Sequence, residues 1–161
     1  MKKNRIIFEF STFDSLKDLP SEYQQLMKIA VQTRKNAYAP YSNFQVGAAV
    51  LLENGEVVIG NNQENASYPS GLCAERVAVF QAGAKYPGIK INCIAITATS
   101  KNYIVEQPAA PCGNCRQSIA EYEQKQHSPI VLLLMGEKGE VIQCNSVADI
   151  LPLAFNNSFL K

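Results

Sequence analysis

The stretch INCIAITAT, residues 91–99, decides the fold, because it is an apolar run with little polar alternation. A strand with one face in water alternates apolar and polar side chains, whereas a strand covered on both faces reads as a nearly continuous apolar run. The stretch therefore predicts a strand in the middle of a sheet, with helices packed against both faces.

Two pairs of runs on either side of this strand predict a mixed sheet. IVLLLM and EVIQCN, residues 130–135 and 140–145, are joined by only a few residues around 136–139. A parallel crossover needs a dozen residues or more, so these two strands must pair antiparallel. FQVGAAVLL and EVVIGN flank an Asn-Gly turn signal, which predicts a hairpin over about 44–61. Together with residues 91–99, these runs give five strands.

Helical signals separate the strands. Apolar residues recur every three or four positions between Pro20 and Tyr38, and Pro40 follows, which predicts a first helix over about 20–38. Further helices are expected over about 73–84, 113–125 and 147–151. The predicted fold class is α/β, a three-layer α/β/α arrangement around a mixed five-stranded sheet.

The chain of 161 residues fits a single domain, which we expect over residues 20–161. Residues 1–19 are expected to form an N-terminal extension. Within it, the alternation of Ile6, Phe8 and Phe10 fits an added edge strand or subunit contact, or else a flexible tail. The sequence leaves that choice open.

Charge and hydropathy argue against two classes of partner. There are 15 Lys and Arg against 14 Asp and Glu, so we expect neither a nucleic acid nor an anionic membrane as partner. The N-terminal MKKNRIIFEF has too short an apolar run for an export signal, and no stretch is long enough to span a bilayer. We therefore expect a cytoplasmic protein, in which cysteines stay reduced.

Three of the five cysteines predict a metal site. Cys93 and Cys144 lie in strand-like runs and are expected to be small core residues. Cys112 and Cys115 have C-x-x-C spacing at the start of a predicted helix, and Cys73 starts another, where the helix dipole favours the thiolate that binds metal. If the strands before the two helices are neighbours, the three thiols converge. Three protein ligands and one open position are typical of catalytic zinc.

Glu75 and Arg76 complete the predicted site. Two residues after Cys73, the Glu75 carboxylate can stand beside the open position and take a proton from water that the metal activates. Arg76 can offset the negative charge of three thiolates. A thiol-disulfide redox pair and a binding module held by structural zinc are the alternatives from other classes, and stoichiometric zinc would exclude the redox pair.

The motifs CAE (73–75) and PCGNCRQ (111–117) resemble those of zinc-dependent nucleoside deaminases. Zinc deaminases in general carry H-x-E followed by P-C-x-x-C, and Cys73 replaces the histidine here. The all-cysteine form, with YAPYSNFQVGAAV (38–50) and NNQENASYPSGLCAER (61–76), is similar to the small homotetrameric cytidine deaminases. The likeness spans about Leu26 to Phe155.

The resemblance implies a cytidine deaminase-like fold and one zinc ion per chain. It implies hydrolytic deamination of cytidine and deoxycytidine to the uridines, with ammonia released, as in pyrimidine salvage. The runner-up is a deaminase of another aminopyrimidine such as blasticidin S. The implied roles are as follows: Cys73, Cys112 and Cys115 hold zinc, with Arg76 near the thiolates; Glu75 shuttles protons; Phe44 packs on the base; Asn62 and Glu64 bind the ribose 3′-hydroxyl; the Ala74 N–H contacts the base O2; and the Ala110-Pro111 carbonyls face the leaving ammonia.

The resemblance also implies a homotetramer with shared active sites. Phe155 and Tyr68 would reach a neighbouring subunit's pocket. The C-terminal LPLAFNNSFL (151–160) is apolar, as expected of a segment buried against another subunit. Leu153 departs from the family pattern, because a small residue is expected there.

Overall fold

The computed structural model describes residues 1–160 and contains a mixed sheet flanked by helices. Six strands run across this part of the chain in the order β1-β6-β5-β4-β2-β3. The strands are β1 (Phe10–Phe13), β2 (Phe44–Leu52), β3 (Val57–Asn61), β4 (Ile91–Ser100), β5 (Val131–Met135) and β6 (Val141–Cys144). The α-helices are α1 (Ser21–Arg34), α2 (Ala74–Lys85) and α3 (Gly113–Gln126), and a short 3₁₀ turn, η3, covers Val147–Ile150.

Strand β4 lies in the interior of the sheet, as its apolar run predicts. It pairs antiparallel with β2 on one side and parallel with β5 on the other. The predicted antiparallel pairing of β5 with β6 and the β2–β3 hairpin are also present. At the hairpin turn, Gly55 adopts a φ of 84°, a left-handed value that glycine accepts without steric cost.

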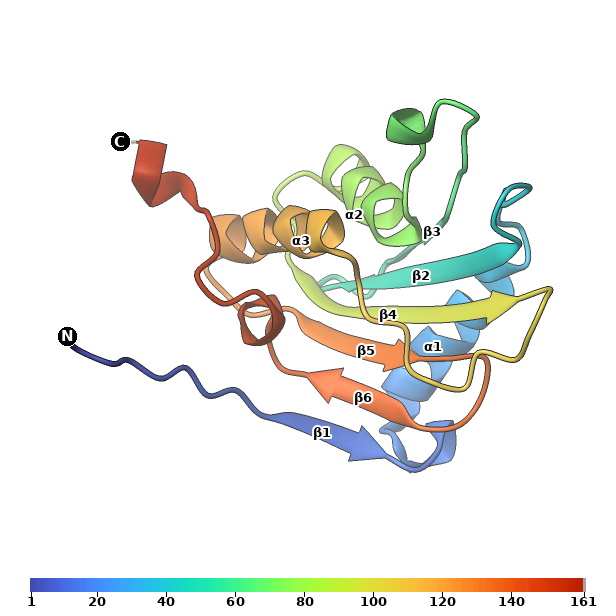
Figure 1. Cartoon of the computed structure of the whole chain (residues 1–161), viewed down its shortest axis with the longest axis horizontal. Helices are drawn as coiled ribbons and strands as arrows, with labels where there is room; N and C mark the ends of the chain where they lie inside the picture. Colours follow the sequence, from blue (N-terminus) through green and yellow to red (C-terminus); the bar gives the residue numbers. More distant parts are fainter. Residues whose placement is uncertain (161) are drawn as a thin grey trace.

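Helices cover both faces of the sheet (Figure 1). On one face, α1 packs through Leu26, Met27 and Ala30 against buried residues of β2, β4 and β5. On the other face, α2 and α3 pack through Ala78, Val79 and Ile119 against a second buried cluster. These two apolar layers confirm the predicted α/β/α arrangement.

The sheet has six strands rather than the predicted five, because the N-terminal extension supplies β1. Phe10 lies opposite Cys144 and Phe13 opposite Val141, in an antiparallel pair at the sheet edge. Of the two readings of the extension, the added edge strand is therefore present. It lies at residues 10–13 rather than over the alternation at 6–10, because β6 offers its ladder only between Val141 and Cys144.

Helix α1 ends at Arg34, four residues before the predicted end. The Tyr38 N–H donates to the Asn62 carbonyl at 3.0 Å, and the Glu64 N–H donates to the Tyr38 carbonyl at 2.8 Å. Tyr38 therefore leaves the helix to pair with the segment after β3. None of the helices within residues 1–160 combines the length and the apolar character that crossing a membrane requires.

Candidate active site

Strand direction brings the starts of α2 and α3 together. The prediction supposed that the strands before these helices are neighbours, but β2 lies between β3 and β4. Both β3 and β4 are antiparallel to β2, so they run parallel to each other and end at the same edge of the sheet. A Cβ at Gly60 of β3 would overlap the Ala74 carbonyl and the Ala78 nitrogen, so glycine lets α2 lie close to the sheet.

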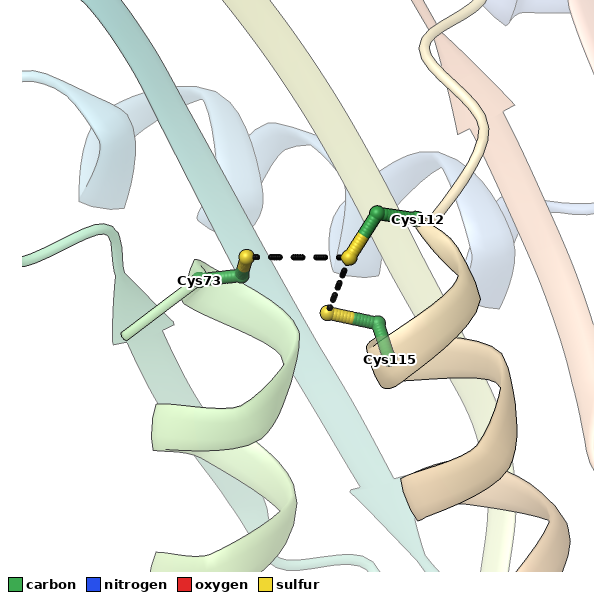
Figure 2. Close-up of side chains that lie close together, drawn as sticks. All are labelled: Cys73, Cys112 and Cys115. Atoms are coloured by element: carbon green, nitrogen blue, oxygen red, sulfur yellow. Dashed lines mark hydrogen bonds between the residues drawn. The ribbon is translucent and has the colours of Figure 1, made fainter. Parts of the chain in front are cut away.

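Three thiols meet between the two helix starts (Figure 2). Cys73 immediately precedes α2, Cys112 immediately precedes α3, and Cys115 lies in the first turn of α3. The Cys112 Sγ lies 3.9 Å from the Cys73 Sγ and 3.5 Å from the Cys115 Sγ. All three sulfurs lie within 4.8 Å of one another. The predicted convergence of these thiols is thus present in the fold.

The electrostatics favour the thiolate at Cys73, whereas the hydrogen bond with Cys73, together with burial, raises the pKa of Cys115. The Cys115 thiol lowers the pKa of Cys73 to about 5, against burial, and Cys112 and Arg76 act in the same direction. Burial alone would lower the pKa of Arg76, but Cys73 and Cys115 outweigh it and raise that pKa.

The donor set and its surroundings fit one zinc ion per chain. Three cysteine sulfurs are suitable zinc ligands, and within residues 1–160 no further His, Cys, Asp or Glu joins them, which matches a site with three protein ligands. Among residues 1–160 the buried Nε of Arg76 has no hydrogen-bond partner, although its Nη2 donates to the Gly71 carbonyl at 3.4 Å. A buried donor without an acceptor is costly, and thiolates that bind a metal would supply the acceptor.

Glu75 is a buried carboxyl group in the first turn of α2. Only 5% of its surface is exposed. Burial raises the pKa of Glu75, and the charge of Cys73 raises it further, although its own backbone N–H and the neighbouring Cys115 and Arg76 oppose the shift. The local chain thus places a protonatable group beside the thiols.

A cavity of about 500 Å³ opens beside Cys73. Five residues singled out from the sequence line it, namely Asn62, Glu64, Tyr68, Cys73 and Arg76. The other lining residues are Tyr41, Ser42, Gln63, Asn65, Gly71 and Leu72. Polar side chains and tyrosine rings therefore adjoin the thiol cluster within one hollow.

Asn62 and Glu64 are held by hydrogen bonds to the start of β2. The Val46 N–H donates to Asn62 Oδ1 at 2.8 Å, and Asn62 Nδ2 donates to the Phe44 carbonyl at 2.9 Å. Glu64 Oε2 accepts from the N–H groups of Tyr41 and Ser42, at 2.9 and 3.2 Å. Glu64 Oε1 accepts from the Ser42 hydroxyl.

The other substrate-binding residues expected from the resemblance are not among the residues that line this cavity. Phe44 begins β2 and is half-buried, and Ala74 is fully buried at the start of α2. The Pro111 carbonyl accepts from Arg116 Nε at 2.7 Å, while Ala110 is exposed. Phe155 is 56% exposed and stacks on Phe159 instead of lining the cavity.

The C-terminal segment is fastened to α3 by two side chains that sequence reasoning did not single out. Arg116 Nη1 donates to the Ile150 carbonyl at 2.8 Å, and Gln117 Nε2 donates to the Phe155 carbonyl at 3.0 Å. Both residues belong to the PCGNCRQ motif, and their place in that motif is the sequence signal that could have singled them out. Leu153 has a φ of 59°, in the left-handed region that favours glycine, which gives a physical reason to expect a small residue there.

Residues 20–129 match the family model of the cytidine and deoxycytidylate deaminase zinc-binding region. The chain belongs to this deaminase family. A family relative, the cytidine deaminase of Halalkalibacterium halodurans, is 42% identical over 133 residues, covering 82% of this chain and 92% of the relative. The cytidine deaminase of Sporosarcina psychrophila is 36% identical over 141 residues, covering 87% of this chain and 96% of the relative.

Solved structures from the same deaminase family share the fold. The crystal structure of the cytidine deaminase from Burkholderia pseudomallei has a TM-score of 0.72 and 39% identity, covering 85% of this chain and all of that one (100%). That of the Mycobacterium tuberculosis cytidine deaminase has a TM-score of 0.65 and 31% identity, covering 85% of this chain and 99% of the other. The likeness of fold and family extends over most of the chain.

Proposed function

We propose that this chain is a cytidine deaminase, which hydrolyses cytidine and deoxycytidine to uridine and deoxyuridine and releases ammonia. The observation that carries the proposal is the meeting of three thiols within 4.8 Å, with the buried Glu75 two residues beyond Cys73. Family membership and the two relatives at 42% and 36% identity support it. Free thiols also suit a cytoplasmic enzyme, because that compartment keeps cysteines reduced.

In this proposal Cys73, Cys112 and Cys115 hold the zinc ion. When bound, zinc supplies the Lewis acidity that activates a water molecule near neutral pH. Arg76 carries a positive charge next to three thiolates, so its guanidinium reduces the net negative charge of the site.

Glu75 moves the protons of the reaction. Its carboxylate takes a proton from the water that attacks C4 of cytosine, and it gives that proton to N3 of the ring. Glu75 then takes the remaining proton from the hydroxyl group on C4 and gives it to the amino group, and the C4–N bond breaks as ammonia leaves and the C4 carbonyl forms. One carboxyl group thus serves as base and then as acid. Its burial keeps the carboxyl away from bulk water that would otherwise compete for the proton.

The cavity residues bind the nucleoside. Phe44 packs on the base, and the Ala74 N–H, which has no intrahelical partner at the start of α2, donates to the base O2. Asn62 and Glu64 bind the 3′-hydroxyl of the sugar. The carbonyls of Ala110 and Pro111 accept from the leaving ammonia.

The substrate range tests this function. Cytidine and deoxycytidine should both be deaminated, because the contacts proposed for Asn62 and Glu64 do not depend on the 2′ position. Free cytosine should be poor, because it lacks the sugar that Asn62 and Glu64 are proposed to bind. CMP should be poor, because Arg76 is the only basic residue that lines the cavity within residues 1–160, and it faces the thiolates rather than a phosphate dianion.

The measurement is a spectrophotometric panel of cytidine, deoxycytidine, cytosine, CMP and blasticidin S with the purified protein. Faster turnover of CMP than of cytidine would overturn the assignment to a nucleoside. Turnover of blasticidin S with none of cytidine would establish the runner-up substrate class instead.

We further propose that the active unit is a homotetramer whose pockets are completed by a neighbouring chain. Tyr68 and Phe155 are 77% and 56% exposed, and both would be buried at such a contact. Phe155 also lies outside the cavity of its own chain, which suits a residue that closes a neighbour's pocket.

A mixed-subunit experiment tests the shared site. Phe155→Ala should raise KM about tenfold without removing zinc, because burial of an aromatic ring against substrate is lost. Glu75→Gln chains mixed with Phe155→Ala chains under exchanging conditions should gain activity above either parent, since some pockets would combine an intact Glu75 with a neighbour's intact Phe155.

In the control, chains that carry both substitutions take the place of the Phe155→Ala chains. No pocket in that mixture contains an intact Glu75, so activity should not rise. Verified mixed oligomers without a gain, or a fully active monomer at assay concentration, would rule out the shared site.

A further inference from the structure

The Ser42 hydroxyl connects two residues of the proposed nucleoside site. It donates to Glu64 Oε1 and accepts from the Phe44 N–H at 3.0 Å. Asn43, between Ser42 and Phe44, has a φ of 57°, a left-handed conformation that asparagine accepts more readily than most residues. This turn lets the hydroxyl of Ser42 reach both the carboxylate across the cavity wall and the backbone two residues ahead.

We propose that Ser42 is a positioning residue that sets Glu64 for the sugar and Phe44 for the base. The inference rests on the proposed function, in which Glu64 binds the 3′-hydroxyl and Phe44 packs on cytosine. Ser42 and Glu64 both line the cavity, whereas the hydroxyl of Ser42 is occupied by its two protein partners. Ser42 therefore acts through Glu64 and Phe44 rather than on the substrate itself.

The hydrogen bonds to Glu64 define what this carboxylate can still bind. A carboxylate offers about four acceptor sites, and three are used by the Tyr41 N–H, the Ser42 N–H and the Ser42 hydroxyl. Burial alone would raise the pKa of Glu64, but these donors outweigh it and hold the pKa below the ordinary value. Glu64 is thus an ionised acceptor with room for one more donor, which matches one sugar hydroxyl.

Removal of the Ser42 hydroxyl affects both neighbours. Glu64 keeps the two N–H donors to Oε2 but loses the donor to Oε1, so its carboxylate is held less firmly, and the Phe44 N–H loses its acceptor. Asn62 still braces this part of β2 through Val46 N–H and the Phe44 carbonyl, so the strand itself keeps its position. The expected defect is therefore in recognition of the sugar rather than in folding or in the thiol cluster.

The test compares cytidine with 3′-deoxycytidine in three variants. Ser42→Ala should lower kcat/KM for cytidine about tenfold, mainly through KM, because one hydrogen bond to a charged group is lost. Its kcat/KM for 3′-deoxycytidine should change much less, so the preference for cytidine shrinks. Ser42→Thr keeps the hydroxyl and should therefore keep most of the parent's preference for cytidine over 3′-deoxycytidine. Ser118→Ala, which removes a hydroxyl from the surface of α3, should match the parent.

Zinc content and thermal midpoint are measured on each variant to separate recognition from folding. Equal losses on both nucleosides would overturn the role of Ser42 in positioning Glu64, and Ser42→Ala kinetics identical to the parent's would overturn its role altogether. Either result leaves the deaminase assignment intact. A parent protein with zinc but no activity on cytidine would overturn the proposed function, and the role of Ser42 with it.

Discussion

The Glu75→Gln variant is expected to lose about a thousandfold or more in kcat for cytidine while keeping its fold and its zinc. Glutamine preserves the shape of the side chain and can occupy the same buried place in α2, but it neither takes a proton from water nor delivers one to the ring. Because one carboxyl group is proposed to serve both proton transfers, both steps are impaired together. Steady-state kinetics with cytidine, together with metal analysis and circular dichroism, measure the effect.

Glu121→Gln is the matched control. Glu121 is exposed on α3, so this substitution makes the same chemical change away from the cavity. It should leave kcat unchanged. A Glu75→Gln protein whose kcat stays within about tenfold of the parent value would assign the proton transfers to another group.

Loss of one sulfur from the thiol cluster is expected to abolish both metal binding and activity. Cys112→Ala leaves only two thiols, so the zinc content should fall from about one ion per chain to near zero. Inductively coupled plasma mass spectrometry on dialysed protein gives the zinc content, and cytidine turnover gives the activity.

Cys93→Ala provides the control for loss of a thiol as such. Cys93 is only 1% exposed and lies in the core beneath α1, so its replacement should keep zinc at the parent level. Full zinc occupancy in Cys112→Ala would remove Cys112 from the ligand set.

The sequence predicts the sheet best where apolar patterning and linker length act together. The nearly continuous apolar run of β4 predicts burial on both faces, and the short link between β5 and β6 allowed only an antiparallel pair. The end of α1 could not be predicted in the same way. Its limit depends on Tyr38 pairing with residues 62–64, a contact that periodicity within one segment does not encode.

The candidate site, too, could be predicted from the sequence only in part. Helix starts and C-x-x-C spacing indicate that Cys112 and Cys115 face one point, but the place of Cys73 depends on the direction of β3 and β4 rather than on their adjacency. Tyr41 and Ser42 lie within the YAPYSNFQVGAAV motif, but their part in the cavity could not be predicted, because it arises from hydrogen bonds to Glu64, 22 or more positions away. Such contacts follow from the finished hairpin and not from local pattern.

The pairing of strand β1 with β6 has a consequence for the order in which the strands fold. Phe10 pairs with Cys144, 134 positions later, so β1 can pair with β6 only after the residues between them have been synthesised. Closing so long a loop carries an entropic cost, and a ladder of four residue pairs does little to offset it alone. We therefore expect residues 10–13 to pair only after β5 and β6 have formed the part of the sheet that β1 joins. Strand β1 is then expected to lie outside the folding nucleus and to join the sheet last.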